Sequence, residues 1–439
     1  MDVKSAFLNG VLHEQVYVEQ PPGFVLQGHE HKVLHLVKAL YGPRQAPRAW
    51  YSKLDESLLK LSFQRSASKH AVYLCGMGDR LLVVGVYVDD LVITGANNVD
   101  IDTFKAEMQA MFKMSDLGLL HYYLGPEVSQ TEAGITVSQS AYLAKILENA
   151  GLTGCNPSHT PMEPRLQLSK LSTAPGVDPI HYRSIVGSLR YLVNSRPDLA
   201  YSVGYVSKFM ENPTTEHLGE VKRILRYISG TLSYGCQYQR KKEEASLVGY
   251  SDSDHAGGID TWKSTSGVLF FLGNNIVTWQ FQKQRVVALS SCEAEYIAAA
   301  TAACQGVWLS PGNPRNRVVA LSSCEAEYIA AATAACQGVW LARLLAELKE
   351  EKIGAITLKI DNQSAIALSR NPVLHDRSKH IDVRYHYIRE CVEENRVQLQ
   401  SIGTSEQLAD ILTKALGREQ FCSLRSRIGV HDVQHTHKD

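Results

Sequence analysis

Two adjacent aspartates, Asp89 and Asp90, interrupt an apolar stretch of the chain. Residues Leu81–Val86 precede them and Leu91–Thr94 follow, and both flanks are rich in β-branched residues. This pattern predicts a β-hairpin whose turn presents the two carboxylates. Burying unpaired carboxylates costs roughly several kcal/mol, so a divalent metal, which prefers hard oxygen ligands, is a natural partner for them. A solvated turn without chemistry explains these residues equally well.

Composition limits the class of protein. The chain has 439 residues, of which 44% are hydrophobic and 21% charged, as is typical of a soluble globular protein with two or three domains. The formal net charge is zero, so a nucleic-acid partner would have to bind a local patch. The nine cysteines form no CxxC motif, which favours free thiols over disulfides or a zinc site. With no apolar run of about 20 residues and no signal-peptide pattern, we expect an intracellular protein without a membrane segment.

Two further motifs lie near the start of the chain. Asp2 is in a short strand-like segment, Met1–Gly10, and Gly42–Tyr51 combines a proline-glycine turn with basic and aromatic residues. Helical periodicity then runs from Arg48 to Leu61. Basic and aromatic residues at a helix start suit contacts with phosphates and bases, although Trp50 is explained equally well as a packing residue. The candidate nucleic-acid contacts here are Gln45, Arg48 and Trp50.

Several ordered motifs of the first half resemble the reverse transcriptase of copia-type retrotransposons. MDVKSAFLNG around Asp2, GPRQAPRAWY and YVDD resemble its polymerase palm. SDLGLLHYYLGPEV (Ser115–Val128) is similar to its primer-gripping hairpin. HYRSIVGSLRYLVNSRPDLAYSV (His181–Val203) and VKRILRYISGTLSYG (Val221–Gly235) resemble its thumb and connection region. The number and order of these motifs make the resemblance specific, whereas YVDD alone would be weak evidence.

By this resemblance, Asp2, Asp89 and Asp90 would hold two Mg²⁺ (or Mn²⁺) ions. One ion would activate the primer 3′-hydroxyl and the other would stabilise the leaving pyrophosphate. The implied partners are an RNA template, a DNA primer and deoxynucleotides. The family's fingers precede the Asp2 motif and are absent from this sequence, and Pro43-Arg44 replaces the family's usual Leu-Lys. We therefore expect a polymerase architecture and regard polymerase activity as doubtful.

The second half places acidic residues at the ends of predicted elements. The apolar alternation predicts a run of strands, then a helix, then more strands and a final helix. An acid on a late helix can thus converge with acids that end neighbouring strands. The predicted elements are strands Leu247–Asp252, Ser266–Leu272, Asn275–Gln282, Ile356–Ile360 and Val397–Ile402, a helix beginning at Ser322, and a helix Thr404–Lys414.

These elements carry motifs that resemble the ribonuclease H of copia-type polyproteins. The motifs are YSDSDHAG, SSCEAEYIA, KIDNQSAIAL and EQLADILTK. The resemblance assigns Asp252, Glu327 or its twin Glu295, Asp361 and Asp410 as catalytic carboxylates and metal ligands. Two Mg²⁺ ions would activate water and stabilise the departing 3′-oxygen as the RNA strand of an RNA–DNA hybrid is cut.

Other polar residues of this region have weaker assignments. Asp254 is a poorer candidate ligand and is explained as a surface acid. The segment His375–Glu390 also resembles the family, and its basic residues Lys379 and Arg384 are candidates for contacts with phosphate.

An exact repeat interrupts this region. Residues 285–309 and 317–341 are identical over 25 positions and are joined by SPGNPRN. If the first copy docked, Pro311 and Gly312 would fall inside a helix, and a proline there costs about 3 kcal/mol. If the second copy docks, the insert only lengthens a loop, at about 0.6 kcal/mol per doubling. We therefore prefer Glu327 over Glu295 as the catalytic glutamate.

Together these observations predict an α+β protein in which a polymerase palm and thumb precede a ribonuclease H-like mixed five-stranded sheet with helices. The predicted function is that of the RNA-directed DNA polymerase and hybrid-cleaving ribonuclease region of a retrotransposon polyprotein, with the other polyprotein segments as partners. The alternative is a non-catalytic, decayed or mispredicted fragment that binds nucleic acid weakly. The expected location is the cytoplasm, in virus-like particles, with the nucleus as a second compartment. The predicted domains are residues 1–150 (palm), 151–244 (thumb and connection), 245–420 (ribonuclease H-like) and 421–439 (tail).

Overall fold

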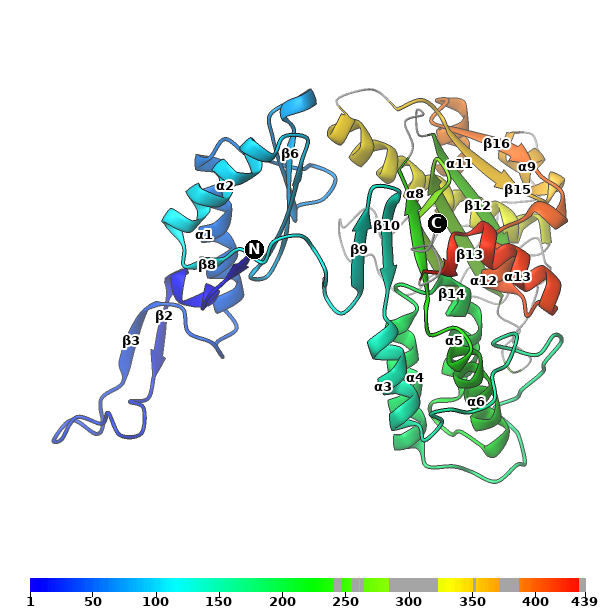
Figure 1. Ribbon diagram of the computed structural model, residues 1–439, viewed down its shortest axis with the longest axis horizontal. Helices are drawn as coiled ribbons and strands as arrows, with labels where there is room; N and C mark the ends of the chain where they lie inside the picture. Colours follow the sequence, from blue (N-terminus) through cyan, green and yellow to red (C-terminus); the bar gives the residue numbers. More distant parts are fainter. Residues whose placement is uncertain are drawn as a thin grey trace. The chain divides into compact units, whose positions relative to one another are not determined.

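The computed structural model comprises two compact units, which we describe separately (Figure 1). One unit consists of Met1–Leu120 with Arg343–Lys352, and the other of His121–Ala342 with Ile353–Asp439. The structure describes residues 1–240, 246–254, 260, 264–283, 323–349, 353–370 and 387–433, excluding the side chains of 323–330, 332, 333 and 368.

The first unit is built on a six-stranded sheet with the order β4-β5-β6-β7-β1-β8. Its strands are β1 (Asp2–Val3), β4 (Gln64–Arg65), β5 (Val72–Cys75), β6 (Leu82–Tyr87), β7 (Asp90–Gly95) and β8 (Met114–Ser115). Every second residue of β6 from Leu82 to Val86 is buried, as expected for a strand with one face on a core. Helix α1 (Ala46–Lys60) buries Trp50 and Leu54 against the same core, and α2 (Asn98–Met111) adds Phe104.

Two further strands of this unit, β2 (Val11–Val18) and β3 (Leu34–Lys38), form a separate antiparallel ribbon. The short helices of the unit are the 3₁₀ turns η1 (Ala6–Asn9) and η2 (Gly78–Arg80).

The second unit contains two sheets. The larger has the order β14-β13-β12-β15-β16, in which β12 pairs with β15 and β15 with β16 in parallel, while the other pairs are antiparallel. Its strands are β12 (Leu247–Ser253), β13 (Thr265–Leu272), β14 (Asn275–Lys283), β15 (Ile356–Ile360) and β16 (Val397–Ser401). Each lies within one residue of its predicted bounds. The predicted α+β class is confirmed.

The smaller sheet has the order β17-β11-β10-β9 and is antiparallel. Its strands are β9 (Glu127–Thr131), β10 (Gly134–Ser138), β11 (Tyr234–Gln239) and β17 (Val430–Asp432). Strand β17 and helix α13 (Arg418–Arg427) therefore give regular structure to residues predicted as a tail.

Most helices belong to the second unit, and α8 (Ser323–Lys349) continues from this unit into the first at Arg343. The helices of the second unit are α3 (Ser140–Asn149), α4 (Pro179–Leu192), α5 (Ala200–Val206), α6 (Thr215–Ser229), α8, α9 (Gln363–Arg370), α11 (Tyr387–Glu393) and α12 (Asp410–Thr413), with 3₁₀ turns η3 (Pro197–Leu199), η4 (Ser207–Phe209) and η7 (Thr404–Glu406). Helix α6 begins six residues before the segment from Val221 that we had assigned to the thumb, because Thr214 and His217 form a capping box. In the part of the chain that the structure describes, no helix combines the length and apolarity needed to cross a bilayer.

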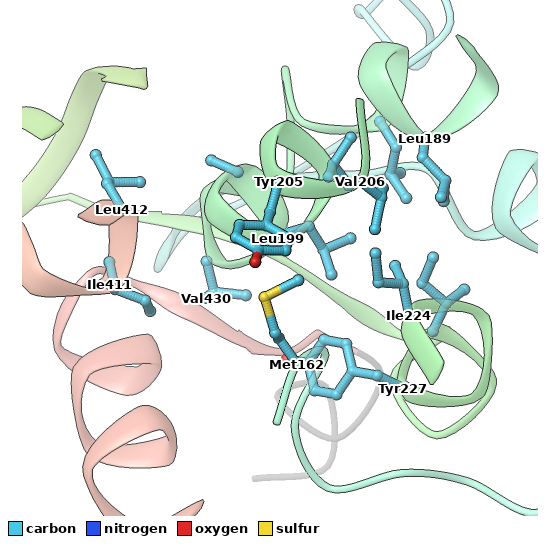
Figure 2. Close-up of a cluster of buried hydrophobic side chains, with 14 of the residues drawn as sticks. Met162, Leu189, Leu199, Tyr205, Val206, Ile224, Tyr227, Ile411, Leu412 and Val430 are labelled. Atoms are coloured by element: carbon cyan, nitrogen blue, oxygen red, sulfur yellow. The ribbon is translucent and has the colours of Figure 1, made fainter. Parts of the chain in front are cut away.

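One hydrophobic core joins the helices α4–α6 to the larger sheet. Figure 2 shows Leu189, Val206 and Ile224 of these helices in one cluster with Ile411 and Leu412 of α12. Strand β13 contributes to the same cluster. The short helix α12 is therefore held in place by residues that are about 200 positions earlier in the sequence.

Helix α8 contains residues 323–341 of the second copy and continues without a break to Lys349, as predicted for docking of this copy. Gly338 lets it approach the sheet closely, since a Cβ atom there would lie 3.0 Å from the Phe270 ring and 3.1 Å from the Ile356 side chain. The first copy, residues 285–309, lies outside the described residues. The choice between the two glutamates stays a prediction.

One predicted helix is wrong. Residues Thr404–Lys414 are not a single helix, because η7 ends at Glu406 and α12 begins at Asp410. Between them Gln407 has an extended backbone (φ −71°, ψ 101°), and its Nε2 donates a hydrogen bond of 2.8 Å to the Ser251 carbonyl of β12. The backbone groups of Gln407 keep only local bonds to Thr404 and Asp410, so the continuous helix is interrupted where the side chain is bound to the sheet.

Candidate metal centre

Asp252 and Asp361 are brought together by two adjacent parallel strands. The register pairs Tyr250 of β12 with Lys359 of β15. Continuing it by two residues places Asp252 beside Asp361, the residue that follows β15. Residues two positions apart in a strand share a face, so both carboxylates lie on the face that carries Tyr250 and Lys359.

Asp410 reaches the same point from helix α12, which packs on β13. The antiparallel partner of Asp252 on β13 is Gly267. A Cβ atom at this glycine would lie 2.8 Å from the Leu412 Cβ and 2.9 Å from the Thr413 Cγ2. The missing side chain at Gly267 therefore lets α12 sit directly on the strand, which brings Asp410 to the two strand-borne acids.

The three carboxylates form a compact cluster. One oxygen from each of Asp252, Asp361 and Asp410 lies within 4.8 Å of the others, and no other group of three potential metal ligands meets this limit among the described residues. Asp252 and Asp410 are only 1% and 2% exposed. The Oδ1 atom of Asp361 is buried without a hydrogen-bond partner in the described structure. A cluster of hard oxygen ligands with an unsatisfied buried atom fits a divalent cation.

Thr413, the last residue of α12, and Lys414, which follows it, contact the cluster. The Lys414 ammonium lies 2.7 Å from Asp410 Oδ1 and 3.3 Å from Asp252 Oδ2. The Thr413 hydroxyl donates a hydrogen bond to Asp252. Burial, followed by repulsion from Asp252, raises the pKa of Asp410 to about 7 and also raises the pKa of Asp361. The cluster is therefore short of positive charge even with the lysine in place.

Several predicted site residues lie outside this description. Glu295, Lys379 and Arg384 are not among the described residues, and the side chain of Glu327 is not described although its backbone belongs to α8. Their roles stay predictions.

Asp254 is not the solvated surface acid that we expected. It is half-buried, and it accepts a hydrogen bond from the Thr265 backbone N–H. Burial raises the pKa of Asp254 to about 7. Its polar contact with β13 indicates that Asp254 helps to hold the end of β12.

The acidic residues of the first unit lie on neighbouring elements, but their carboxylate oxygens do not form a group of three within 4.8 Å. The predicted hairpin is present as β6 and β7, with Val88 and Asp89 as its two-residue turn. Strand β1 lies next to β7, and Asp2 is the direct cross-strand partner of Asp90. Burial, then the nearby Asp89 and Asp2 carboxylates, raises the pKa of Asp90. Two of the three predicted ligands are therefore neighbours in one sheet, and the third, Asp89, precedes Asp90 in the turn.

Trp50 stabilises this turn through a hydrogen bond to its backbone. Val88 has a positive φ of 55°, which is an outlier for a β-branched residue, and its carbonyl accepts a 2.6 Å hydrogen bond from the Trp50 indole. The Trp50 side chain is buried, so the structure favours the packing alternative for this residue over a contact of its ring with nucleic acid. Of the two other candidates, Arg48 is exposed near the start of α1 and Gln45 is half-buried.

Sequence reasoning missed three residues that contact or support the carboxylate cluster. Lys414 is four residues after Asp410, a spacing that brings side chains together on a helix, and this signal was available. Gly267 lies inside a strand pattern, where a glycine often marks a close backbone approach. The contact of Gln407 with Ser251 joins residues 156 positions apart and had no local signal.

We expect Gly267→Ala to lower the free energy of unfolding by about 1–3 kcal/mol, since the new methyl group collides with α12. The matched control is Gly187→Ala, at an exposed helical position where nothing lies within 4 Å of the new Cβ. Alanine is favoured over glycine in helices, so the control should be neutral or stabilising. Urea denaturation followed by circular dichroism measures both, and equal midpoints for the two variants would contradict the close approach.

Sequence comparisons show which proteins the chain resembles. Residues 1–164 match the family model described as reverse transcriptase (RNA-dependent DNA polymerase). The retrovirus-related Pol polyprotein from transposon RE1 of Arabidopsis thaliana is 38% identical over 433 residues, covering 99% of this chain and 27% of the relative. The corresponding polyprotein from transposon TNT 1-94 of Nicotiana tabacum is 37% identical over 445 residues, covering 98% of this chain and 31% of the relative.

A shorter relative is matched over almost its whole length. The putative transposon Ty5-1 protein of Saccharomyces cerevisiae is 34% identical over 303 residues, which is 68% of this chain and 98% of that protein. The chain thus spans between a quarter and a third of the length of the two Pol polyproteins above. These similarities show that the chain belongs to the copia-type retrotransposon Pol polyproteins, with a reverse transcriptase segment at residues 1–164.

Proposed function

We propose that residues 245–420 form a ribonuclease H domain that cuts the RNA strand of RNA–DNA hybrids with the help of divalent metal. The observation that carries this proposal is the cluster of Asp252, Asp361 and Asp410 at the ends of two adjacent parallel strands and a packed helix. The larger sheet, of order β14-β13-β12-β15-β16, supports it, because a mixed five-stranded sheet is what the resemblance implies.

The residues of the cluster have separable roles in this proposal. Asp252, Asp361 and Asp410 would hold the metal, with Glu327 of α8 as a fourth ligand. A bound divalent ion supplies the Lewis acidity that activates water and stabilises a departing 3′-oxygen. The Thr413 hydroxyl orients Asp252. The close packing of α12 against Gly267 holds Asp410 next to the other two acids. Mg²⁺ is the proposed ion, and Mn²⁺ has the same ligand preference.

The reverse transcriptase segment supplies the second part of the proposed function. Asp2 and Asp90 lie on adjacent strands, Asp89 lies in the turn just before β7, and the three would bind the divalent ions of an RNA-directed DNA polymerase. The proposed substrates are an RNA template, a DNA primer and deoxynucleotides, with the other segments of the Pol polyprotein as partners. The Asp2–Asp90 pairing is the observation that favours this second activity.

A hybrid-cleavage assay tests the first proposal. The purified chain is incubated with labelled RNA in an RNA–DNA hybrid, in an RNA duplex and as a single strand, with Mg²⁺ or with EDTA. We expect cleavage of the hybrid only, dependent on Mg²⁺, with products that carry a 3′-hydroxyl. Absence of cleavage under all conditions would favour the alternative, a non-catalytic chain that binds nucleic acid weakly.

The exact repeat provides an internal control for the catalytic glutamate. Glu327 and Glu295 have identical neighbours over the 25-residue copies. We expect Glu327→Gln to reduce hybrid cleavage by roughly 10²-fold, the size typical of losing one electrostatic contributor, and Glu295→Gln to leave it unchanged. Initial rates of cleavage measure both variants. Loss of activity in the Glu295 variant alone would reverse the assignment of the docked copy.

A further inference from the structure

The ammonium group of Lys414 lies between two of the three acids. Its Nζ atom is 2.7 Å from Asp410 Oδ1, 3.4 Å from Asp252 Oδ1 and 3.3 Å from Asp252 Oδ2. Among the described residues it is the only basic side chain within 4.0 Å of the cluster. One positive charge thus bridges an acid on β12 and an acid on α12.

The contacts of Lys414 reduce the repulsion among the three carboxylates when no metal is bound. Three carboxylates crowded within 4.8 Å repel one another, and two of them are almost fully buried. Buried charges are tolerated only when they are paired. Lys414 pairs Asp252 with Asp410, whereas the Oδ1 atom of Asp361 has no hydrogen-bond partner in the described structure.

The same position conflicts with metal binding. A divalent ion shared by Asp252 and Asp410 would bind the same two carboxylates that Lys414 contacts, and two cations in that space would repel each other. The Lys414 side chain is 37% exposed, and a lysine has a flexible four-carbon stem. Its ammonium can therefore withdraw to solvent while its backbone stays in place.

We propose that Lys414 is a built-in counter-cation of the carboxylate cluster, which stabilises the metal-free site and is displaced when a divalent ion binds. The proposal rests on the proposed function only in taking the three acids as metal ligands. Lys414 is thus a positioning residue that sets the affinity for metal and does not act on substrate. A lysine that served only as a helix surface residue would not influence that affinity.

The test measures binding of Mn²⁺ alone to the full chain, by calorimetry and by electron paramagnetic resonance of the free ion. In Lys414→Met we expect Mn²⁺ to bind about tenfold tighter or more, because the ion no longer displaces a cation. We also expect the metal-free variant to melt at a lower temperature and to regain more stability from Mn²⁺ than the wild type. Lys359→Met is the matched control, since its ammonium contacts the Tyr250 hydroxyl at 3.2 Å on the same sheet face.

A second variant, Lys414→Arg, controls for the possibility that Lys414→Met does not fold. Lys414→Arg keeps the positive charge and should retain the metal-free stability and the wild-type Mn²⁺ affinity. Unchanged or weaker Mn²⁺ binding in Lys414→Met, with the arginine variant folded, would overturn the proposal. If the wild type and both variants are folded and bind no Mn²⁺, the cluster is not a metal site and the proposed nuclease function fails with the inference. If all bind equally, the inference fails alone.

Discussion

Replacing Asp361 with asparagine is expected to reduce hybrid cleavage by roughly 10³-fold or more, as is typical of residues that act as one catalytic unit, without unfolding the protein. Asparagine has nearly the same shape but lacks the charge that a shared metal requires. The substitution also removes one of three mutually repelling carboxylates. The carboxylate that it removes, Asp361, has a buried oxygen without a hydrogen-bond partner in the described structure. The melting temperature of the metal-free variant should therefore be unchanged or higher.

The control for this experiment is Asp178→Asn. The Asp178 side chain caps α4 by accepting hydrogen bonds from the N–H groups of Ile180 and His181, and asparagine caps helices equally well. The control should keep both activity and stability. Initial rates and thermal melts of the two variants provide the comparison, and an Asp361→Asn enzyme that retains wild-type rates would exclude the cluster as the catalytic centre.

The second large effect is expected at a buried ion pair far from the cluster in sequence. Arg196 contacts Asp198 through two hydrogen bonds of 2.9 and 2.8 Å, and Tyr227 donates a third, of 2.7 Å, to the same carboxylate. Both charged side chains are essentially inaccessible to solvent. Asp198→Asn leaves the guanidinium buried without its counter-charge, so we expect the free energy of unfolding to fall by about 3–5 kcal/mol.

An exposed ion pair supplies the matched control for Asp198→Asn. Glu406 and Arg427 form a 2.6 Å pair in which both side chains are well exposed. Such pairs contribute at most about 1 kcal/mol, so Glu406→Gln should change the urea midpoint little. Equal destabilisation by the two substitutions would show that the Arg196–Asp198 pair is not a buried support of the fold.

The buried Arg196–Asp198 pair also makes the stability of the protein depend on pH. Burial alone would raise the pKa of Asp198, but the Arg196 guanidinium outweighs it and holds the pKa below its ordinary value. A carboxyl whose pKa is lowered by folding contributes stability above its ordinary pKa of about 3.9 and loses it as the pH falls through the folded value. The difference in unfolding free energy between wild type and Asp198→Asn should therefore narrow below about pH 4. A constant difference down to pH 2 would contradict this coupling.

The sequence predicted the parts of the site that follow from local pattern. Asp252 and Asp361 each come at the end of an apolar strand, so their positions at one edge of a sheet could be predicted from alternation alone. The hairpin around Asp89 was predicted for the same reason. These local predictions needed no knowledge of which strands pair.

What depended on distant contacts could not be predicted in this way. The break before Asp410 arises because Gln407 is tethered to β12, and no local signal opposes a continuous helix there. The basic residues before Trp50 predict a contact with bases. In the structure its indole instead donates a hydrogen bond to the carbonyl of Val88, whose φ is positive. Lys414 could be paired with Asp410 from spacing, but its contact with Asp252 spans 162 positions.

The core that α12 shares with α4–α6 limits how this region can change over time. Ile411 and Leu412 pack in one cluster with Val206 and Ile224, so a volume change on either side has to be matched on the other. Recombination between related elements that exchanged only the chain after residue 245 would combine α12 from one parent with its supporting helices from another. We therefore expect the acid-bearing helix and its upstream support to be exchanged only as one block, and the positions of the two groups to co-vary among related elements.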